Sequence, residues 1–231
     1  MCWGQSASRE ATAKNCGTRP TLGRSFLAVT LRSMNLAVLV SGSGTLLEAM
    51  LAADLPVTLV VADRLCRGLE IAREHQVPAQ LVERTDFGVG FDRDAYALSV
   101  LDRLRSHQID LIAMAGFGTI LGEPVFAAYP SSILNTHPAL LPAFPGWHAV
   151  RDALDAGVSV TGCTVHIATP VVDAGPILAQ ESVDVWASDD EDTLHERIKV
   201  VERRLYVETL QHILERGSVL EPTTPESGVT T

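Results

Sequence analysis

The segment 133–146, ILNTHPALLPAFPG, begins like a buried strand and ends in a loop with three prolines and a glycine. Because side chains on a strand alternate between its two faces, Asn135 and His137 should point the same way. An amide N–H can stabilise a developing oxyanion, and an imidazole changes charge near neutral pH. The pair therefore indicates attack on a carbonyl carbon; the alternative is a polar strand end that carries a satisfied histidine.

The same segment holds no Ser or Cys that could act as a nucleophile. This favours direct transfer between two bound molecules over a covalent intermediate. The three prolines fix φ and remove three donors, so the loop should hold the pair rigidly. The remaining histidines lack such a context, and we interpret most of them as surface or packing residues: His75, His107, His148, His166, His195 and His212.

A glycine turn, SGSG at 41–44, stands between a strand-like run and a helix-like run. Backbone N–H groups in the first turn of such a helix can hold a phosphate. A dinucleotide fingerprint would place a third glycine where Leu47 stands, although Asp63 could serve as its acid. Three interpretations stay open here: a simple tight turn, a phosphate cradle and a dinucleotide site.

Short apolar runs alternate with helical patterns along the chain, which predicts an α/β fold. The expected architecture is Rossmann-like: a mostly parallel, twisted sheet with helices on both faces, an antiparallel C-terminal edge and a long closing helix. We expect strands within 36–40, 57–63, 77–82, 109–117, 131–137, 159–169 and 176–185, and helices within 45–53, 66–76 and 91–107. Buried helix faces are predicted at Leu98, Leu101 and Leu104, and at Leu194, Ile198, Val201 and Leu205.

Composition limits the class of protein. The chain has 231 residues, is 46% hydrophobic and carries a net charge of −10, which disfavours nucleic acid and anionic membranes as partners. The four cysteines form no CxxC pair, which is typical of a reducing compartment, so we expect a cytoplasmic protein. We expect a disordered extension or mis-assigned start at 1–33, a catalytic domain at 34–217 and a flexible tail at 218–231.

Two motifs together, LNTHPALLPAFPG and TGCTVHIATPVVDAGPIL, resemble the folate-dependent formyltransferases. The similarity extends from about Met34 to the final helix. The family's Asn, its His two residues on and the Asp of its D-x-G-P turn correspond to Asn135, His137 and Asp173. The resemblance implies that His137 acts as a cation on the formyl group, that Asn135 holds the formyl oxygen, and that Asp173 keeps His137 protonated.

Within the family, the match is best to the members that formylate the amino group of 5'-phosphoribosylglycinamide in purine synthesis. The implied formyl donor is 10-formyltetrahydrofolate as co-substrate, with no metal and no ATP. The implied partners are small molecules, and the protein is expected as a monomer or homodimer. The family also implies a cis peptide at Leu141–Pro142.

Further positions carry over from the same resemblance. The implied ribonucleotide-binding residues are Gly44, Thr45, Leu46, Pro138, Lys199 and Glu202. The implied folate-binding residues are Arg93, Gly118, Thr119, Ile120, Leu121, Asn135, Thr169 and Asp173. This chain departs from the family at Leu46, where Asn is common, and at Gly118–Thr119, where Met–Arg is common.

Other activities fit the same residues less well. Methionyl-tRNA formyltransferases usually add a basic C-terminal domain, and this chain is too short and too acidic to supply it. Formyltetrahydrofolate hydrolases carry an N-terminal regulatory domain that residues 1–33 could not form. A nucleotide-binding oxidoreductase or a plain binding module would rest on the glycine turn alone.

Overall fold

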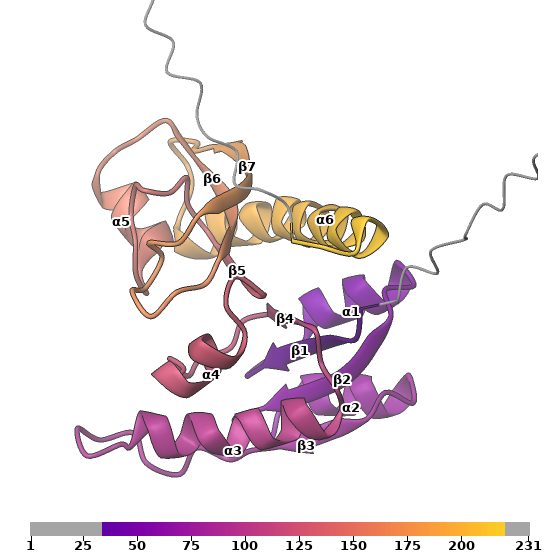
Figure 1. The fold of residues 1–231 in the computed structure, drawn as a ribbon. Coiled ribbons are helices and arrows are strands. Elements are labelled where there is room, and N and C mark those ends of the chain that lie inside the picture. The colour runs from indigo at the N-terminus through magenta and orange to yellow at the C-terminus, as the bar shows by residue number, and fades with distance from the viewer. Residues whose placement is uncertain (1–33, 220–231) are drawn as a thin grey trace, which may run out of the picture. The chain divides into compact units, whose positions relative to one another are not determined.

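A computed structural model describes residues 34–219 (Figure 1). The expectations for residues 1–33 and for the tail from residue 220 lie outside this range. Within it, no helix is both long and apolar enough to cross a lipid bilayer.

One seven-stranded sheet runs through residues 34–219, in the order β3-β2-β1-β4-β5-β6-β7. Its strands are β1 (Leu36–Val40), β2 (Val57–Ala62), β3 (Ala79–Leu81), β4 (Leu111–Met114), β5 (Ile133–His137), β6 (Val160–Ile167) and β7 (Ile177–Asp184). Strands β1 to β5 pair in parallel, whereas β6 pairs antiparallel with both β5 and β7. The predicted mostly parallel sheet with an antiparallel C-terminal edge is confirmed.

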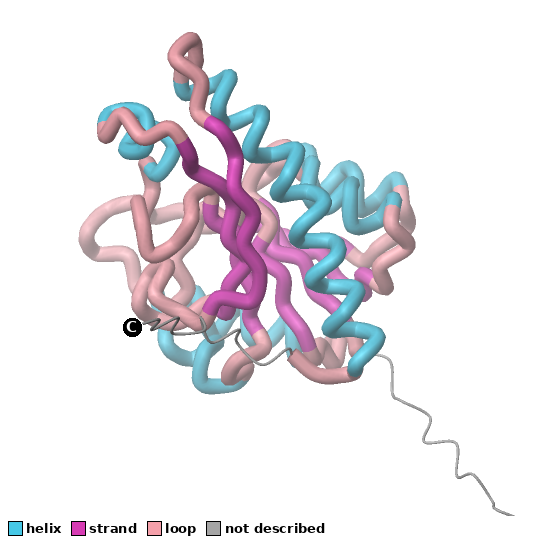
Figure 2. The backbone as a smooth tube through the Cα atoms, turned by 90° about the horizontal axis from the view of Figure 1, so that it is seen from above, coloured by secondary structure: helices cyan, strands magenta, loops and turns pink. Residues whose placement is uncertain are grey.

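Helices cover both faces of this sheet, as Figures 1 and 2 show. They are α1 (Thr45–Ala52), α2 (Arg67–Glu74), α3 (Arg93–Ser106), α4 (Glu123–Ala128), α5 (Ala149–Asp155) and α6 (Glu191–Arg216). One core cluster joins the sheet to α1, α2, α5 and α6, and the other joins it to α3 and α4. Alternation along β1 divides its side chains between the two clusters, because neighbouring residues on a strand face opposite ways.

The long closing helix α6 is confirmed, and its predicted face is buried or packed against the core. It begins with a capping box at Asp190 and ends at Gly217, whose φ is +71°. The prediction for α3 is wrong in one respect: Leu101 and Leu104 are buried, but Leu98 is 56% exposed. Steps of three residues drift around a helix of 3.6 residues per turn, so Leu98 leaves the buried face. Helices α4 and α5 were not predicted.

The topology brings the glycine turn and the Asn–His strand to one edge. Strand β4 lies between β1 and β5, and all three are parallel, so their carboxyl ends meet there. The strand order reverses between β1 and β4, and such switch points are where open α/β sheets bind ligands. Met114 of β4 lies directly beside Asn135 of β5, which places the pair at that edge.

Candidate active site

Strand β5 presents its polar residues as the alternation predicts. Asn135 and His137 contact groups on one side of the strand, whereas the Thr136 hydroxyl lies 3.2 Å from the Cys163 sulfur on the other. His137 is 4% exposed and Thr136 is 9% exposed. The strand therefore separates the face that carries Asn135 and His137 from a face that packs under α6.

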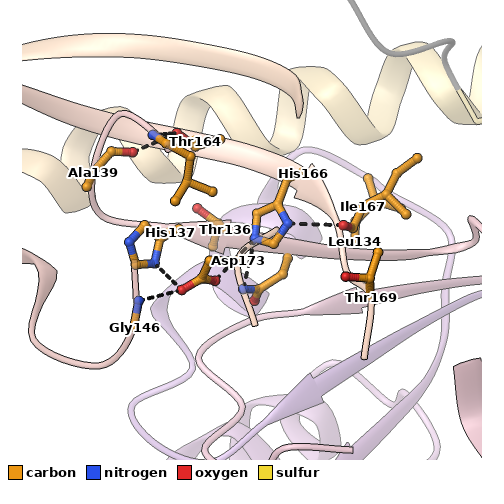
Figure 3. Close-up of polar contacts among 12 residues, drawn as sticks. Leu134, Thr136, His137, Ala139, Gly146, Thr164, His166, Ile167, Thr169 and Asp173 are labelled. Carbon is orange, nitrogen blue, oxygen red and sulfur yellow. Dashed lines mark hydrogen bonds and ion pairs between the residues drawn. The ribbon is translucent and has the colours of Figure 1, made fainter. Parts of the chain in front are cut away.

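The ring of His137 lies between two oxygen acceptors. Its Nδ1 is 3.3 Å from a carboxylate oxygen of Asp173, and its Nε2 is 2.7 Å from the carbonyl oxygen of Phe144 (Figure 3 shows the Asp173 contact). Neither acceptor can donate a proton, so a ring with N–H groups at both positions satisfies both. This arrangement suits the imidazolium form of His137.

Asp173 has polar neighbours at both carboxylate oxygens. Its Oδ2 accepts a hydrogen bond of 2.8 Å from the backbone N–H of Gly146, and its Oδ1 lies 3.6 Å from Nε2 of His166. Burial alone would raise the pKa of Asp173, but its polar surroundings, among them the Gly146 N–H and the charge of His137, outweigh that effect. The net result is a pKa below the usual value, so the carboxylate stays ionised near neutral pH.

Backbone strain is concentrated at the two residues that meet His137. Phe144 has φ +52° and Asp173 has φ +55°, both in the left-handed region. Such conformations are uncommon outside glycine and often occur at functional sites. Gly175 allows the turn at Asp173 to form, because a Cβ at this position would clash with the Ile167 carbonyl oxygen.

Two side chains of the antiparallel edge, one buried and one exposed, anchor the proline loop. The Thr164 hydroxyl donates to the Ala139 carbonyl at 2.6 Å and accepts the Leu141 N–H at 3.1 Å. Gln180 donates from its amide both to Thr164, at 2.9 Å, and to the Leu141 carbonyl, at 2.8 Å. The Leu141–Pro142 peptide is cis, as expected. Since this loop carries the Phe144 carbonyl and the Gly146 N–H, the anchors place both groups that contact the His137–Asp173 pair.

His166 is a site residue that sequence reasoning missed. Sequence reasoning gave His166 no part in the site, but its Nε2 lies 3.3 Å from the amide nitrogen of Asn135 and faces Asp173 (Figure 3 shows His166 and Asp173). Register explains the contact: β5 and β6 pair with Asn135 directly opposite His166. The local signal was the T-x-H alternation at Thr164 and His166, which puts two polar residues on one face of the strand.

The glycine turn opens α1, with Gly44 at its N-cap in a left-handed conformation (φ +74°). Thr45 is exposed, whereas the Leu46 side chain is 6% exposed and lies in the core. Only the backbone N–H of Leu46 is therefore available to a ligand at the turn. A phosphate cradle here would be built from main-chain donors.

The predicted folate segment 118–121 follows β4 at the same edge. Ile120 is 44% exposed, whereas the side chains of Thr119 and Leu121 are buried. The Thr119 hydroxyl donates at 2.7 Å to Asp63, a fully buried carboxylate that also holds Arg64. The segment therefore offers a ligand its backbone and Ile120 rather than a row of side chains.

The sequence offers Asp63 as the acidic residue that would bind the ribose in a dinucleotide site. It is 0% exposed, and its oxygens are engaged by Arg64 at 3.0 and 3.1 Å and by Thr119. Burial would raise its pKa, but these hydrogen bonds lower it overall. A carboxylate committed in this way is not free to accept ribose hydroxyls, which removes the main support for a dinucleotide site.

The remaining predicted residues lie in several places. Arg93 is exposed at the start of α3 and lines a cavity of about 480 Å³ together with Arg84 and Phe91. On α6, Lys199 pairs with Glu196 at 2.7 Å, and Glu202 interacts with Thr136, behind β5. Burial raises the pKa of Glu202. Its contact with Thr136 and two nearby cations lower the pKa by less, so the net shift is upward.

Two further predicted residues flank the catalytic groups. Pro138 follows His137 directly and is half-buried. The Thr169 hydroxyl donates to the Val171 carbonyl at 2.8 Å, in the turn that leads to Asp173. Among the residues of 34–219, no three His, Cys, Asp or Glu side chains are grouped as a metal site would require.

Comparisons with known proteins agree on one family. The formyl transferase family model matches residues 34–210. A phosphoribosylglycinamide formyltransferase of Mycobacterium tuberculosis is 48% identical over 187 residues, which cover 79% of this chain and 86% of that protein. One from Bacillus subtilis is 34% identical over 185 residues, covering 77% and 93%.

Solved structures give the same result. The crystal structure of glycinamide ribonucleotide transformylase 1 from Symbiobacterium toebii superposes with a TM-score of 0.75 at 39% identity, covering 81% of this chain and 91% of that one. A phosphoribosylglycinamide formyltransferase from Streptococcus pneumoniae gives a TM-score of 0.72 at 35% identity, covering 78% and 98%.

Proposed function

This chain belongs to the formyl transferase family, and we propose that it transfers the formyl group of 10-formyltetrahydrofolate to the amino group of 5'-phosphoribosylglycinamide. The products are 5'-phosphoribosyl-N-formylglycinamide and tetrahydrofolate, within purine synthesis. The observation that carries the proposal is the buried His137 held between Asp173 and the Phe144 carbonyl, with Asn135 on the same face.

The reaction begins when the substrate amine attacks the formyl carbon. A C–N bond forms, the formyl oxygen gains negative charge, and the bond from carbon to N10 of the folate then breaks. The His137 Nε2–H turns from the Phe144 carbonyl to the formyl oxygen, where Asn135 adds a second N–H. His137 gives its Nε2 proton to N10 of the leaving tetrahydrofolate and then takes up the proton lost by the attacking amine, so the ring ends the reaction protonated as it began.

Asp173 supports these reaction steps through His137 and does not itself contact the reacting atoms. Its ionised carboxylate, 3.3 Å from His137 Nδ1, favours the charged ring, and the Gly146 N–H fixes its orientation. A cationic His137 places positive charge where the oxyanion develops. No protein nucleophile is required, because both reactants are bound together.

The proposal assigns residues to both reactants. We assign the phosphate to the main-chain donors of Gly44, Thr45 and Leu46 at the start of α1, and the ribose to Glu202. Lys199 and Pro138 complete that side of the site. Lys199 must leave Glu196 to reach the ribonucleotide.

Folate occupies the other side in this proposal. Its flat rings lie along the backbone of 118–121 and along Thr169, and its acidic tail reaches Arg93. The cavity lined by Arg93, Arg84 and Phe91 suits an aromatic acid, since an arginine pairs with carboxylates and stacks on rings. Arg84 already stacks on Phe91, with 4.2 Å between the guanidinium carbon and the ring centroid.

The proposal extends to the protein's setting. In this proposal the catalytic domain comprises residues 34–217. It works in the cytoplasm as a monomer or homodimer, without metal or ATP. The cysteines of the described part, Cys66 and Cys163, are free, which accords with a reducing compartment. Sedimentation of the pure protein would decide between monomer and dimer.

A three-arm assay tests the function. Pure protein and 10-formyltetrahydrofolate are followed by folate absorbance with 5'-phosphoribosylglycinamide, with no acceptor, and with initiator methionyl-tRNA. We expect turnover in the first arm alone. Turnover without acceptor would identify a hydrolase, and turnover with the tRNA alone would identify a different acceptor. The Asp173→Asn variant serves as the matched inactive control.

A further inference from the structure

His166 occupies a position in β6 that the proposed reaction leaves without a task. It is 1% exposed and faces the same side of the sheet as Asn135 and His137, because register pairs it with Asn135. A buried histidine among polar groups must satisfy both ring nitrogens. The partners of those nitrogens therefore define what the ring does.

The contacts of His166 fix its proton. Nδ1 lies 3.1 Å from the carbonyl oxygen of Ile167, which only accepts, so Nδ1 carries the hydrogen. Nε2 lies 3.3 Å from the amide nitrogen of Asn135, which only donates, so Nε2 keeps its lone pair. The Asp173 oxygen near Nε2 is farther away, at 3.6 Å. The geometry selects a neutral ring that is protonated at Nδ1.

We propose that neutral His166 is a positioning residue that orients the Asn135 amide for catalysis. This inference rests on the proposed function. One N–H of the Asn135 amide is directed to His166 Nε2, so the amide cannot rotate to present its oxygen there. The second N–H is then left for the formyl oxygen, the group that gains charge as the amine attacks.

The rotation that His166 prevents would be costly to catalysis. Asn135 lies within β5, and its half-buried side chain can adopt either of two amide orientations unless a neighbour selects one. Flipping the amide would aim its oxygen's lone pairs at the developing oxyanion. The effect of His166 should therefore fall on kcat and not on the KM of the ribonucleotide, whose phosphate and ribose are held elsewhere.

Two substitutions separate positioning from packing. His166→Leu fills the space but removes the acceptor, and we expect kcat to fall about tenfold or more with KM for the ribonucleotide little changed. His166→Gln can place an amide oxygen near the Nε2 position, and we expect it to recover most of that loss. His75→Gln, at an exposed histidine that follows α2, is the matched control and should leave both constants unchanged. Thermal unfolding of each variant confirms that it folds.

Double-mutant cycles identify the residue through which His166 acts. If it acts through Asn135, His166→Leu adds little further loss in an Asn135→Ala background and its full loss in an Asp173→Asn background. The reverse pattern would show that His166 acts through the carboxylate, and full loss in both backgrounds would show a merely structural role. Either of these last two results overturns the proposal.

A measurement without turnover completes the test, so that it stands apart from the proposed function. Nitrogen-15 NMR of the imidazole rings in the full-length protein at neutral pH reports which nitrogen carries the proton. We expect one buried histidine, lost in His166→Gln, with Nδ1 protonated and Nε2 bare. A His166 ring protonated at Nε2 would overturn the proposal even in an active enzyme, and an inactive wild-type protein with the expected ring would refute only the proposed reaction.

Discussion

The two sides of the candidate active site are built in different ways. On the side of β5, β6 and the Asp173 turn, buried side chains hold one another: Asn135, His137, His166 and Asp173 form a continuous polar network. On the side of β1 and β4, the glycine turn and segment 118–121 offer mainly backbone groups and one exposed side chain, Ile120.

The two sides should differ in how well they tolerate substitution. A buried polar network loses stability and geometry when a single partner is removed. A backbone cradle keeps its donors whatever the side chains are, so long as the chain follows the same path. The departures at Leu46, Gly118 and Thr119 all lie on the backbone side, whereas Asn135, His137 and Asp173 match the family.

The largest predicted effect is on the network side. We expect His137→Ala and Asp173→Asn each to lower kcat by about 10²- to 10⁴-fold, the range of general acid–base catalysis, while the fold survives. Steady-state kinetics and circular dichroism check the two parts of this prediction. Near-normal turnover by either variant would remove that residue from the mechanism.

The next effect falls on the anchor of the proline loop. Thr164→Val removes the hydroxyl that bonds Ala139 and Leu141, and we expect about 1–3 kcal/mol of lost stability with about a tenfold lower kcat. Thr161→Val is the matched control: it lies on the same strand, is 1% exposed, and its hydroxyl has no partner. Equal losses in both variants, measured by urea unfolding and kinetics, would mean that the loop is positioned by other contacts.

A smaller effect should follow on the backbone side from Gly44→Ala. The new Cβ would lie 2.8 Å from Ile71 Cδ1 and 2.9 Å from Gly68 Cα, at a φ of +74° that costs about 1–2 kcal/mol. We expect a several-fold higher KM for the ribonucleotide with kcat nearly unchanged. Gly116→Ala has a similar φ of +69° but open space around its Cβ, so it should cost less stability. A change in kcat alone would contradict a binding role for the turn.

The smallest effect is a pH-dependent stability at Glu202. Burial raises the pKa of this carboxyl above its unfolded value, so its ionised form is disfavoured in the fold. Stability that is present below the unfolded pKa is therefore lost as pH rises through the folded pKa. We expect Glu202→Gln to gain stability relative to wild type between pH 4 and pH 8, measured as Tm. Glu215 is exposed, so Glu215→Gln should not gain stability as pH rises. An equal gain in Glu215→Gln would mean that burial of Glu202 is not the cause.

Much of the fold could be predicted from sequence because apolar runs and glycine turns punctuate it clearly. The sheet, its antiparallel edge and α6 follow from runs such as 36–40 and from the face that begins at Leu194. Helices α4 and α5 were missed because they are short, six and seven residues, and bury only one and three side chains, too few for a periodic signal.

The candidate catalytic residues could also be predicted from local sequence patterns. Alternation on one strand put Asn135 and His137 together, and the family motif supplied Asp173. His166 was missed because it meets them through the register of two antiparallel strands, which no local pattern specifies. The Phe144 carbonyl was missed because a main-chain acceptor depends on the path of a loop rather than on residue type.

The most direct test of direct transfer through Asn135, His137 and Asp173 follows the formyl carbon itself. Enzyme in slight excess is mixed with 10-formyltetrahydrofolate carrying a carbon-13 formyl group and with 5'-phosphoribosylglycinamide, and a single turnover is followed by NMR. We predict that the label passes into the formamide of the ribonucleotide, and that His137→Ala slows this step. Label released as formate, or retained on the protein, would contradict the account.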